Sequence, residues 1–167
     1  MTAPDAIDIA AQVADGLAEA HALGIVHRDV KPADVMLVRT GRVKIVDFGI
    51  ARMASAAGVT ATGVVIGTPG CMAPEQARGE TVDGRADLWA LGVVLYEMLA
   101  GRAPFSGASL DETFYAVLHR APEPLERLVP GLPPAVLRIV DRALRKDQVA
   151  RYQQAERAVS ALAPGSP

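Results

Sequence analysis

The sequence feature that most constrains the fold is a single pair of strand-like runs in a chain whose other periodic segments are helical. Residues 35–38 and 43–46 are rich in Val, Leu and Ile, and residues 39–42 between them include a glycine. Two such runs joined by a short turn predict a β-hairpin. Residues 25–26 form a further short strand-like piece. We therefore expect a mainly α fold with one small β-hairpin.

Apolar residues at helical spacing mark several other segments. In residues 5–23 they recur every three or four positions and Gly24 follows, which predicts an amphipathic helix that ends near this glycine. Residues 86–100 form an apolar-rich helical segment closed by Gly101. Pro-rich breaks separate weaker helical patterns at residues 110–119, 134–144 and 153–162.

Length and composition exclude several classes of function. The 167 residues suit one compact domain. The 17 Lys and Arg against 19 Asp and Glu give a net charge of -2, so the chain has no positive electrostatic field that would attract nucleic acid or an anionic membrane. The single cysteine, Cys71, cannot form an internal disulfide, which fits a reducing compartment. No stretch reaches the roughly 18 uncharged apolar residues of a membrane span, and the N-terminus lacks a signal-peptide pattern. We expect a cytoplasmic chain without a nucleic-acid partner or a membrane segment.

Two carboxylates are expected at the open end of the hairpin. If Val38 faces Val43 across the turn, the antiparallel register pairs Asp34 with Asp47. Like charges directly opposite each other destabilise a sheet, so this arrangement makes sense chiefly if a cation neutralises them. A hard divalent cation with oxygen ligands fits, and Mg²⁺ is the obvious candidate.

The loop that leads into the hairpin adds a third carboxylate, Asp29, and a cation, Lys31. A base, a phosphate-binding cation and a metal site would then share one end of one hairpin. The alternative for any one of these residues alone is a solvated aspartate at a turn, which is common. What favours the functional interpretation is the string His-Arg-Asp-Val-Lys-Pro at residues 27–32, followed by Asp-Phe-Gly at residues 47–49.

These strings belong to a longer set that is typical of one family. HRDVKP, VDFGIAR, GTPGCMAPEQ, VDGRADLWALGVVLYEMLAG and the arginine of KDQVARYQ occur in the order and spacing of the eukaryotic-type Ser/Thr protein kinases. The chain resembles that family, most closely its bacterial branch, from about residue 5 to residue 162. The resemblance implies a protein-kinase-like C-terminal (large) lobe over residues 1–163, containing the catalytic loop, the DFG motif, the activation segment and a helical subdomain. Residues 164–167 would be a linker-like tail.

The resemblance also implies roles for particular residues, with ATP and Mg²⁺ as cofactors. Asp29 would be the catalytic base, Lys31 would contact the transferred phosphate, and Asp47, together with Asp34, would bind the metal. A lysine two residues after the base, followed by proline, is typical of Ser/Thr-specific enzymes. The resemblance also implies that Thr68 hydrogen-bonds Asp29 and Lys31 and helps to select Ser or Thr as the acceptor. Met36 would form the floor under the adenine ring.

Other matches are expected to be structural. An ion pair between Glu75 and Arg151 is implied by the resemblance. His21 and His119 are expected to be a helix-end residue and a surface residue, and Trp89 to be a core residue. His27, Asp87 and Phe48 would hold the loops against the long buried helix. Gly49 is the glycine of the DFG motif.

The loop at residues 53–67 corresponds to the activation segment of the family. It is rich in Gly, Ala, Ser and Thr without periodicity, and long loops in compact domains are usually functional. Thr60 and Thr62 resemble the double-threonine site of regulatory phosphorylation, with Arg28 as the phosphate partner. The alternative is that exposed threonines in such a loop have no role.

Three departures from the family pattern stand out. No Gly-rich loop, V-A-I-K lysine, partner glutamate or hinge precedes residue 1, so we expect the small lobe to be absent and the isolated chain to be inactive. Asp34 replaces the family's asparagine and cannot donate an amide hydrogen bond. Cys71 replaces a tyrosine and is expected to loosen the floor under the peptide-binding loop.

Two classes of function follow from these observations. The first is a Ser/Thr protein kinase fragment that transfers the γ-phosphate of ATP to Ser and Thr hydroxyls of protein substrates, with the missing small lobe as a further partner. The second is a non-catalytic, pseudokinase-like binding or scaffold module. The chain would be cytoplasmic in either case, or the cytoplasmic part of a longer, membrane-anchored kinase.

Overall fold

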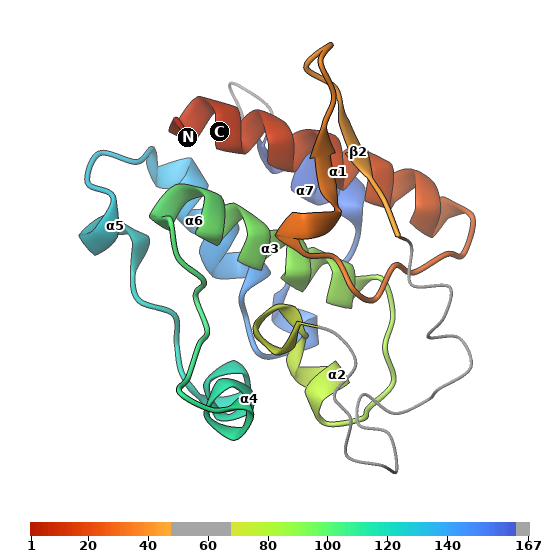
Figure 1. Ribbon diagram of the computed structural model, residues 1–167. Coiled ribbons are helices and arrows are strands. Elements are labelled where there is room, and N and C mark those ends of the chain that lie inside the picture. Colours follow the sequence, from red (N-terminus) through yellow and green to blue (C-terminus); the bar gives the residue numbers. More distant parts are fainter. Residues whose placement is uncertain (48–67, 163–167) are drawn as a thin grey trace.

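The computed structural model describes residues 1–47 and 68–162 of the chain (Figure 1). Short 3₁₀ helices occur at Pro32–Asp34, Pro69–Cys71 and Gln148–Ala150. The helices and strands follow in the order α1 (Ala3–Ala22), β1 (Val35–Leu37), β2 (Val43–Ile45), α2 (Pro74–Ala77), α3 (Arg85–Ala100), α4 (Leu110–His119), α5 (Leu125–Leu128), α6 (Pro134–Ala143) and α7 (Ala155–Leu162). The mainly helical fold with an antiparallel hairpin is as predicted.

Helix α1 begins and ends with well-formed caps. The Thr2 hydroxyl accepts the Asp5 backbone N–H while the Asp5 carboxylate accepts the Thr2 N–H, so the helix starts two residues earlier than its apolar pattern predicts. At the other end Gly24 has φ +74, its N–H donates to the His21 carbonyl, and the Ile25 N–H donates to the Ala20 carbonyl. This cap uses the amide of Ile25, so the strand-like piece predicted at residues 25–26 is wrong.

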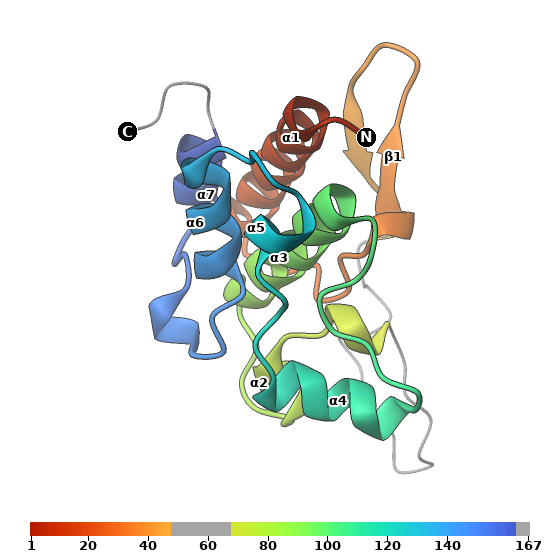
Figure 2. The ribbon, with the colours of Figure 1, turned by 90° about the vertical axis from the view of Figure 1, so that its left-hand side faces the viewer.

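Helix α3 is the central element of the core. Every residue from Ala86 to Tyr96 is buried, and Figure 2 shows the helix in the middle of the molecule, with α1, α6 and α7 around it. Gly92 lets α6 approach closely, because a Cβ atom at this position would lie 2.7 Å from the Ala143 Cβ. The helix ends at Gly101 in the left-handed conformation, as the sequence predicts.

The hairpin differs from the predicted one by a shift of one residue. Val35 pairs with Ile45, whereas the predicted register pairs it with Val46. The cause is the turn, where the Val38 carbonyl accepts the N–H of Gly41 (φ +79) and the Val38 N–H donates to the Arg42 carbonyl. Glycine in the left-handed region allows a three-residue loop in place of the four residues assumed.

The shift changes the expected pairing of acidic residues. The Val46 N–H donates to the Asp34 carbonyl at 2.9 Å, so Asp34 lies opposite Val46 and the predicted direct pairing of Asp34 with Asp47 is wrong. Both aspartates still lie at the open end of the hairpin, because Asp47 follows Val46 directly. The argument for a cation from directly opposed carboxylates is therefore weakened, although two carboxylates remain close to one strand end.

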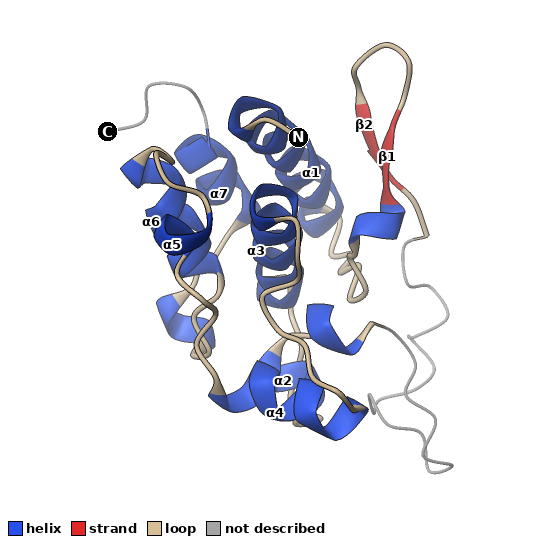
Figure 3. Cartoon of the chain, turned by 60° about the vertical axis from the view of Figure 1, so that its left-hand side comes forward, coloured by secondary structure: helices blue, strands red, loops and turns tan. Residues whose placement is uncertain are grey.

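The hairpin stands on α1 and projects from the helical body, as Figure 3 shows. The Gln12 side chain joins the two elements, since its Oε1 accepts the Val43 N–H at 2.9 Å and its Nε2 donates to the Gly41 carbonyl at 3.4 Å. Ile45 packs over Gly16, where a Cβ would lie 3.3 Å from the Ile45 Cδ1. One face of the hairpin is therefore fixed to the body and the other is left open.

Helix α4 lies apart from the α1 and α3 pair and is tied to the body through a lysine (Figure 2). The Lys146 ammonium donates to the carbonyls of Ala116 and Val117 in the last turn of α4, at 3.3 and 2.6 Å. It also lies 3.7 Å from the ring centre of Phe105 and 4.8 Å from that of Trp89. Burial lowers the pKa of Lys146 to about 8, while the carbonyls and ring faces favour the charged form.

Sequence patterns located most helices correctly. The prediction for residues 110–119 matches α4, and those for residues 86–100, 134–144 and 153–162 agree with α3, α6 and α7 to within one or two residues. The four-residue helices α2 and α5 and the 3₁₀ helices are too short to show a period, and the sequence did not predict them. Over the described ranges, no helix combines the length and the apolar character that crossing a membrane requires.

Candidate active site

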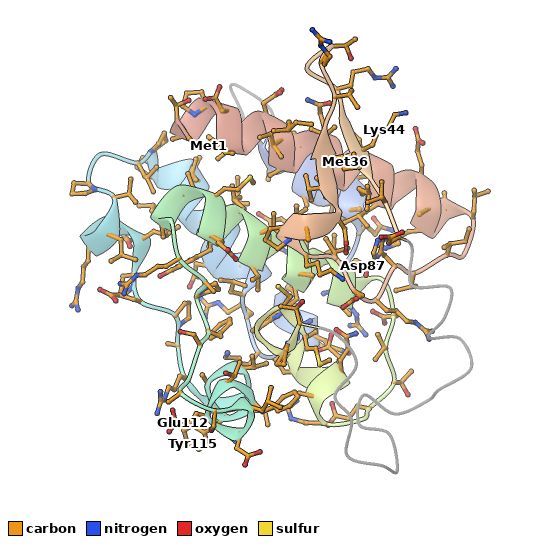
Figure 4. All side chains as sticks on the ribbon, in the orientation of Figure 1. Met1, Met36, Lys44, Asp87, Glu112 and Tyr115 are labelled. Atoms are coloured by element: carbon orange, nitrogen blue, oxygen red, sulfur yellow. The ribbon has the colours of Figure 1, made fainter. Side chains whose placement is uncertain are left out.

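The loop at residues 27–31 is anchored to the N-terminal end of α3 by Asp87. This buried carboxylate accepts the backbone N–H of His27 at 2.9 Å and that of Arg28 at 2.7 Å. It also contacts His21 Nε2 at 2.8 Å. Figure 4 shows Asp87 below the base of the hairpin, where the loop crosses the helix. Asp87 therefore fixes the backbone immediately before Asp29.

Arg28 adopts an unusual backbone conformation. Its φ is +66, in the left-handed region that residues other than glycine rarely occupy. Asp47, which follows the hairpin, has φ +56. Such conformations persist where the surrounding contacts determine them, and they concentrate at functional sites. The two residues flank the loop and the strand end that the sequence assigns to catalysis.

His27 joins this loop to the end of β2. Its buried ring contacts the Val46 carbonyl through Nε2 at 3.2 Å and the Asp29 N–H through Nδ1 at 3.4 Å. A carbonyl only accepts and a backbone N–H only donates, so these partners select the neutral tautomer that carries its proton on Nε2. The ring thus sets the distance between the residue before Asp47 and the backbone of Asp29.

A lysine lies between two of the carboxylates. Lys31 Nζ is 3.1 Å from Asp29 Oδ2 and 3.6 Å from Asp34 Oδ1. The hydrogen bond to Asp29 raises the pKa of Lys31, so its ammonium stays charged. The pKa of Asp34 is raised chiefly by burial, since the residue is only 3% exposed, and Lys31 opposes this shift. The Asp34 Oδ2 atom is buried and has no hydrogen-bond partner within residues 1–47 and 68–162.

These groups determine what could hold a metal ion. Asp47 is exposed, and Asp34, at the same end of the hairpin, has a buried oxygen, Oδ2, that finds no hydrogen-bond partner among the described residues. In the part of the chain that the structure describes, no group of three or more His, Cys, Asp or Glu side chains is placed to bind a metal. Two carboxylates alone are an incomplete set of ligands, of the kind that Mg²⁺ complements with water and phosphate oxygens.

Met36 and Thr68 occupy different surroundings. Met36 is 51% exposed on the open face of the hairpin, opposite Lys44, and Figure 4 shows both side chains on that element. Thr68 precedes the 3₁₀ helix Pro69–Cys71, and its carbonyl accepts the Cys71 N–H. Among the hydrogen bonds formed between described residues, none joins Thr68 to the loop at residues 27–31.

The expected ion pair between Glu75 and Arg151 is present and buried. Arg151 donates from both terminal nitrogens to the two carboxylate oxygens of Glu75, each at 2.7 Å. Its further hydrogen bonds go to the carbonyls of Arg85, Arg145 and Lys146, and its guanidinium lies 5.0 Å from the ring centre of Trp89. This network fixes α2 to the helical body.

The other predicted residues either contribute no side chain to the contacts described above or cannot be placed. Cys71 is buried, and burial raises the pKa of its thiol to about 12, so it is inert as a nucleophile at neutral pH. His119 is exposed on α4, as expected, and its ring is tilted by 47° against that of Tyr115. The predictions for Phe48, Gly49, Thr60 and Thr62 fall outside the described residues.

The structure adds two residues that the sequence did not single out for the site. His21 was expected only at the end of a helix, yet its ring contacts the same Asp87 carboxylate that anchors the loop. Gln76 donates from Nε2 to the Arg28 carbonyl at 2.8 Å. Both contacts join segments far apart in the sequence, and no local pattern of the sequence encodes them.

Comparison with known proteins identifies the family. The protein kinase domain model matches residues 1–161. The chain is 45% identical over 151 residues to the serine/threonine-protein kinase Pkn1 of Myxococcus xanthus, which covers 87% of this chain and 22% of that protein. It is 45% identical over 152 residues to PknB of Mycolicibacterium smegmatis, covering 90% and 24%, and 43% identical over 148 residues to PknA of Mycobacterium tuberculosis, covering 89% and 34%.

The chain thus spans between 22% and 34% of the length of these relatives. The family resemblance predicted from HRDVKP, DFG and the later motifs is confirmed by these matches. The family model covers nearly the whole chain, and all three relatives carry the same description. The chain therefore belongs to the protein kinase domain family, and the relatives it resembles are serine/threonine-protein kinases of bacteria.

Proposed function

We propose that residues 1–163 are the C-terminal, large lobe of a Ser/Thr protein kinase that transfers the γ-phosphate of ATP to Ser and Thr hydroxyls of protein substrates. The observation that carries this proposal is the pair formed by Asp29 and Lys31, whose carboxylate and ammonium lie 3.1 Å apart. They sit on a loop whose backbone is held by the buried Asp87 and His27. A carboxylate base beside a cation, in fixed geometry, is what phosphoryl transfer requires.

The chemistry assigns one task to each group. The substrate hydroxyl oxygen forms a bond to the γ-phosphorus, the bond from this phosphorus to the oxygen bridging it to the β-phosphate breaks, and the hydroxyl proton passes to Asp29. Lys31 places positive charge beside the phosphoryl oxygens, where a fixed cation stabilises the transition state more than mobile water does. Met36, exposed on the open hairpin face, offers an apolar surface to the adenine ring.

Asp34 and Asp47 are the residues that would hold Mg²⁺. The buried Oδ2 of Asp34, which no described residue hydrogen-bonds, supports this assignment, because a buried carboxylate oxygen normally has a hydrogen-bond donor or a cation beside it. When bound, Mg²⁺ neutralises charge on the nucleotide phosphates. Asp34 supplies a carboxylate where the family has an asparagine, so the ion would meet more negative charge from this chain than is usual for the family.

The nucleotide site needs groups outside these residues. The 167 residues contain no G-x-G-x-x-G run and no V-A-I-K lysine, the parts that cover and grip the phosphates in protein kinases. We therefore infer that activity requires a small lobe. We also propose that residues 164–167 are a linker and that the lobe works on the cytoplasmic side. The 167-residue chain alone should not phosphorylate a generic Ser/Thr substrate.

Labelled ATP and a generic protein substrate test this proposal in a protein that joins a kinase small lobe to residue 1. Asp29→Asn should lower the rate by roughly 100-fold or more, the usual range for removing a general base. Asp15→Asn is the matched control, since Asp15 is an exposed residue of α1. If phosphorylation persists equally in Asp29→Asn, the chain is not the catalytic lobe, and the binding-module alternative is favoured.

A further inference from the structure

We infer that Gln76 is a positioning residue for the catalytic loop and ties the segment after Thr68 to the backbone of Asp29. The inference rests on the proposed function in one respect, since it takes Asp29 to be the catalytic base. One amide side chain on α2 forms two hydrogen bonds, and one of them reaches the carbonyl of Arg28, whose backbone is strained.

The Gln76 amide bridges two backbone groups. Its Nε2 donates to the Arg28 carbonyl at 2.8 Å, and its Oε1 accepts the Ala73 N–H at 3.0 Å. The carbonyl can only accept and the N–H can only donate, so the two partners fix which end of the amide faces each of them. The side chain is half-buried, and its orientation is therefore set by both contacts.

Arg28 is clamped on both of its backbone groups. Its N–H donates to Asp87 Oδ1 at 2.7 Å and its carbonyl accepts from Gln76. That carbonyl belongs to the peptide unit joining Arg28 to Asp29, so its direction sets the orientation of the Asp29 backbone. With φ at +66, Arg28 would relax to an ordinary conformation if one of these contacts were lost. Gln76 thus helps to hold the conformation that presents Asp29.

Helix α2 gives Gln76 a rigid base. The preceding residue, Glu75, forms the buried bidentate pair with Arg151, which in turn bonds carbonyls of the α6 to α7 connection. Ala73, the other partner of Gln76, ends the segment that begins at Thr68. A displacement of that segment would therefore reach the Arg28 carbonyl through one amide side chain. The geometry couples residues 68–73 to the catalytic base.

One substitution separates the two bonds of Gln76. Gln76→Glu keeps an oxygen that accepts the Ala73 N–H, but it removes the donor and turns a carboxylate oxygen toward the Arg28 carbonyl. Gln153→Glu is the matched control, because Gln153 also donates from its amide to backbone carbonyls, those of Gln148, Val149 and Arg151. Gln153 lies on the exposed connection to α7, and its hydrogen bonds with other described residues go to Arg85, Gln148, Val149 and Arg151, none of which belongs to the loop at residues 27–31.

Amide hydrogen exchange on the 167-residue chain is the first measurement. Gln76→Glu should speed deuterium uptake in a peptide covering residues 26–31, while uptake in α3 stays unchanged. Gln153→Glu should leave uptake at residues 26–31 unchanged. This readout needs no catalytic activity, so it decides whether Gln76 holds the loop even if the proposed function fails. Equal uptake at residues 26–31 in the parent chain and in Gln76→Glu would overturn the inference.

Steady-state kinetics on the protein with a small lobe is the second measurement. Gln76→Glu should lower kcat about tenfold, as expected for the loss of one well-placed hydrogen bond, with KM for ATP changed less than about twofold. Gln153→Glu should retain the parent kcat. A parent protein without Asp29-dependent activity would refute the proposed function and leave the exchange result standing. A parent kcat in Gln76→Glu would refute the positioning role.

Discussion

The carboxylate of Asp87 accepts the backbone N–H of Arg28 at 2.7 Å, across 59 residues of sequence. The same carboxylate accepts the N–H of His27 and contacts His21 Nε2, so one fully buried side chain organises the loop before Asp29. The loop at residues 27–31 is thus positioned by the first turn of the central helix.

Replacing Asp87 with asparagine should strongly destabilise the protein. The amide NH₂ cannot accept one of the two backbone N–H groups, which is then left buried without a partner. We expect a loss of about 3 kcal/mol in the free energy of unfolding, measured by urea denaturation. Asp83→Asn, four residues earlier in a half-exposed pair with Arg85, should cost less than about 1 kcal/mol. Similar losses in the two variants would mean that the buried anchor contributes little.

Breaking the ion pair between Glu75 and Arg151 should also destabilise the fold. Glu75→Gln leaves the buried guanidinium without a counter-charge, at a cost of roughly 3–5 kcal/mol. The exposed pair between Asp141 and Arg145 provides the comparison, and Asp141→Asn should cost about 0.5 kcal/mol. Urea denaturation of both variants measures the difference. A loss below about 1 kcal/mol in Glu75→Gln would show that the pair is dispensable for stability.

Asp34→Asn should raise the turnover of the protein that carries a small lobe. The amide supplies a donor near the catalytic loop and removes a buried negative charge from the neighbourhood of Lys31 and Asp29. We expect kcat to increase several-fold at saturating ATP and Mg²⁺, with Asp15→Asn as the control. Unchanged or lower turnover would show that the aspartate serves the metal as well as an asparagine does.

Thr60 and Thr62 should be the regulatory phosphorylation sites, a hypothesis that concerns residues outside the described ranges. A phosphate adds nearly two negative charges and could form charge-assisted bonds with Arg28, the residue before Asp29. Mass spectrometry of the autophosphorylated protein with a small lobe should find phosphate on one or both threonines. The Thr60→Ala, Thr62→Ala double variant should lose most activity. Full activity there, or phosphate confined to Ser55 or Thr40, would contradict the hypothesis.

Lys146 should give the stability of the protein a distinct pH dependence. Burial lowers its pKa from 10.5 to about 8 in the native state. Between these values the unfolded chain holds a proton that the native chain has lost, so native stability should rise with pH relative to Lys146→Met. The slope can reach about 1.4 kcal/mol per pH unit. Below pH 8 the two curves should run parallel.

Urea denaturation from pH 7 to 10 measures this difference. Lys44→Met, at an exposed lysine of the hairpin, is the control, and its stability should run parallel to that of the parent chain because it retains Lys146. Parallel curves for the parent chain and Lys146→Met up to pH 10 would mean that the two carbonyls and the two aromatic rings hold the pKa of Lys146 near its ordinary value.

The sequence predicted most of the helical framework because local interactions determine it. Apolar periodicity located α1, α3, α4, α6 and α7, and Gly24 and Gly101 marked helix ends through the conformation that only glycine adopts easily. It did not predict the hairpin register, since a single residue in the turn decides between two pairings of similar composition. The left-handed Gly41 selected the shorter loop, and Asp34 then lay opposite Val46.

The sequence by itself determined which side chains the site contains and to which family the chain belongs, because Asp29, Lys31, Asp47 and the motifs around them are contiguous strings. Only the tertiary structure decided how these groups are held. Asp87, His27 and Gln76 reach the loop through hydrogen bonds between residues far apart in the chain. The strength of such bonds depends on distances of a few tenths of an ångström and on burial. Packing of α1, α2 and α3 sets both quantities, and no local pattern records them.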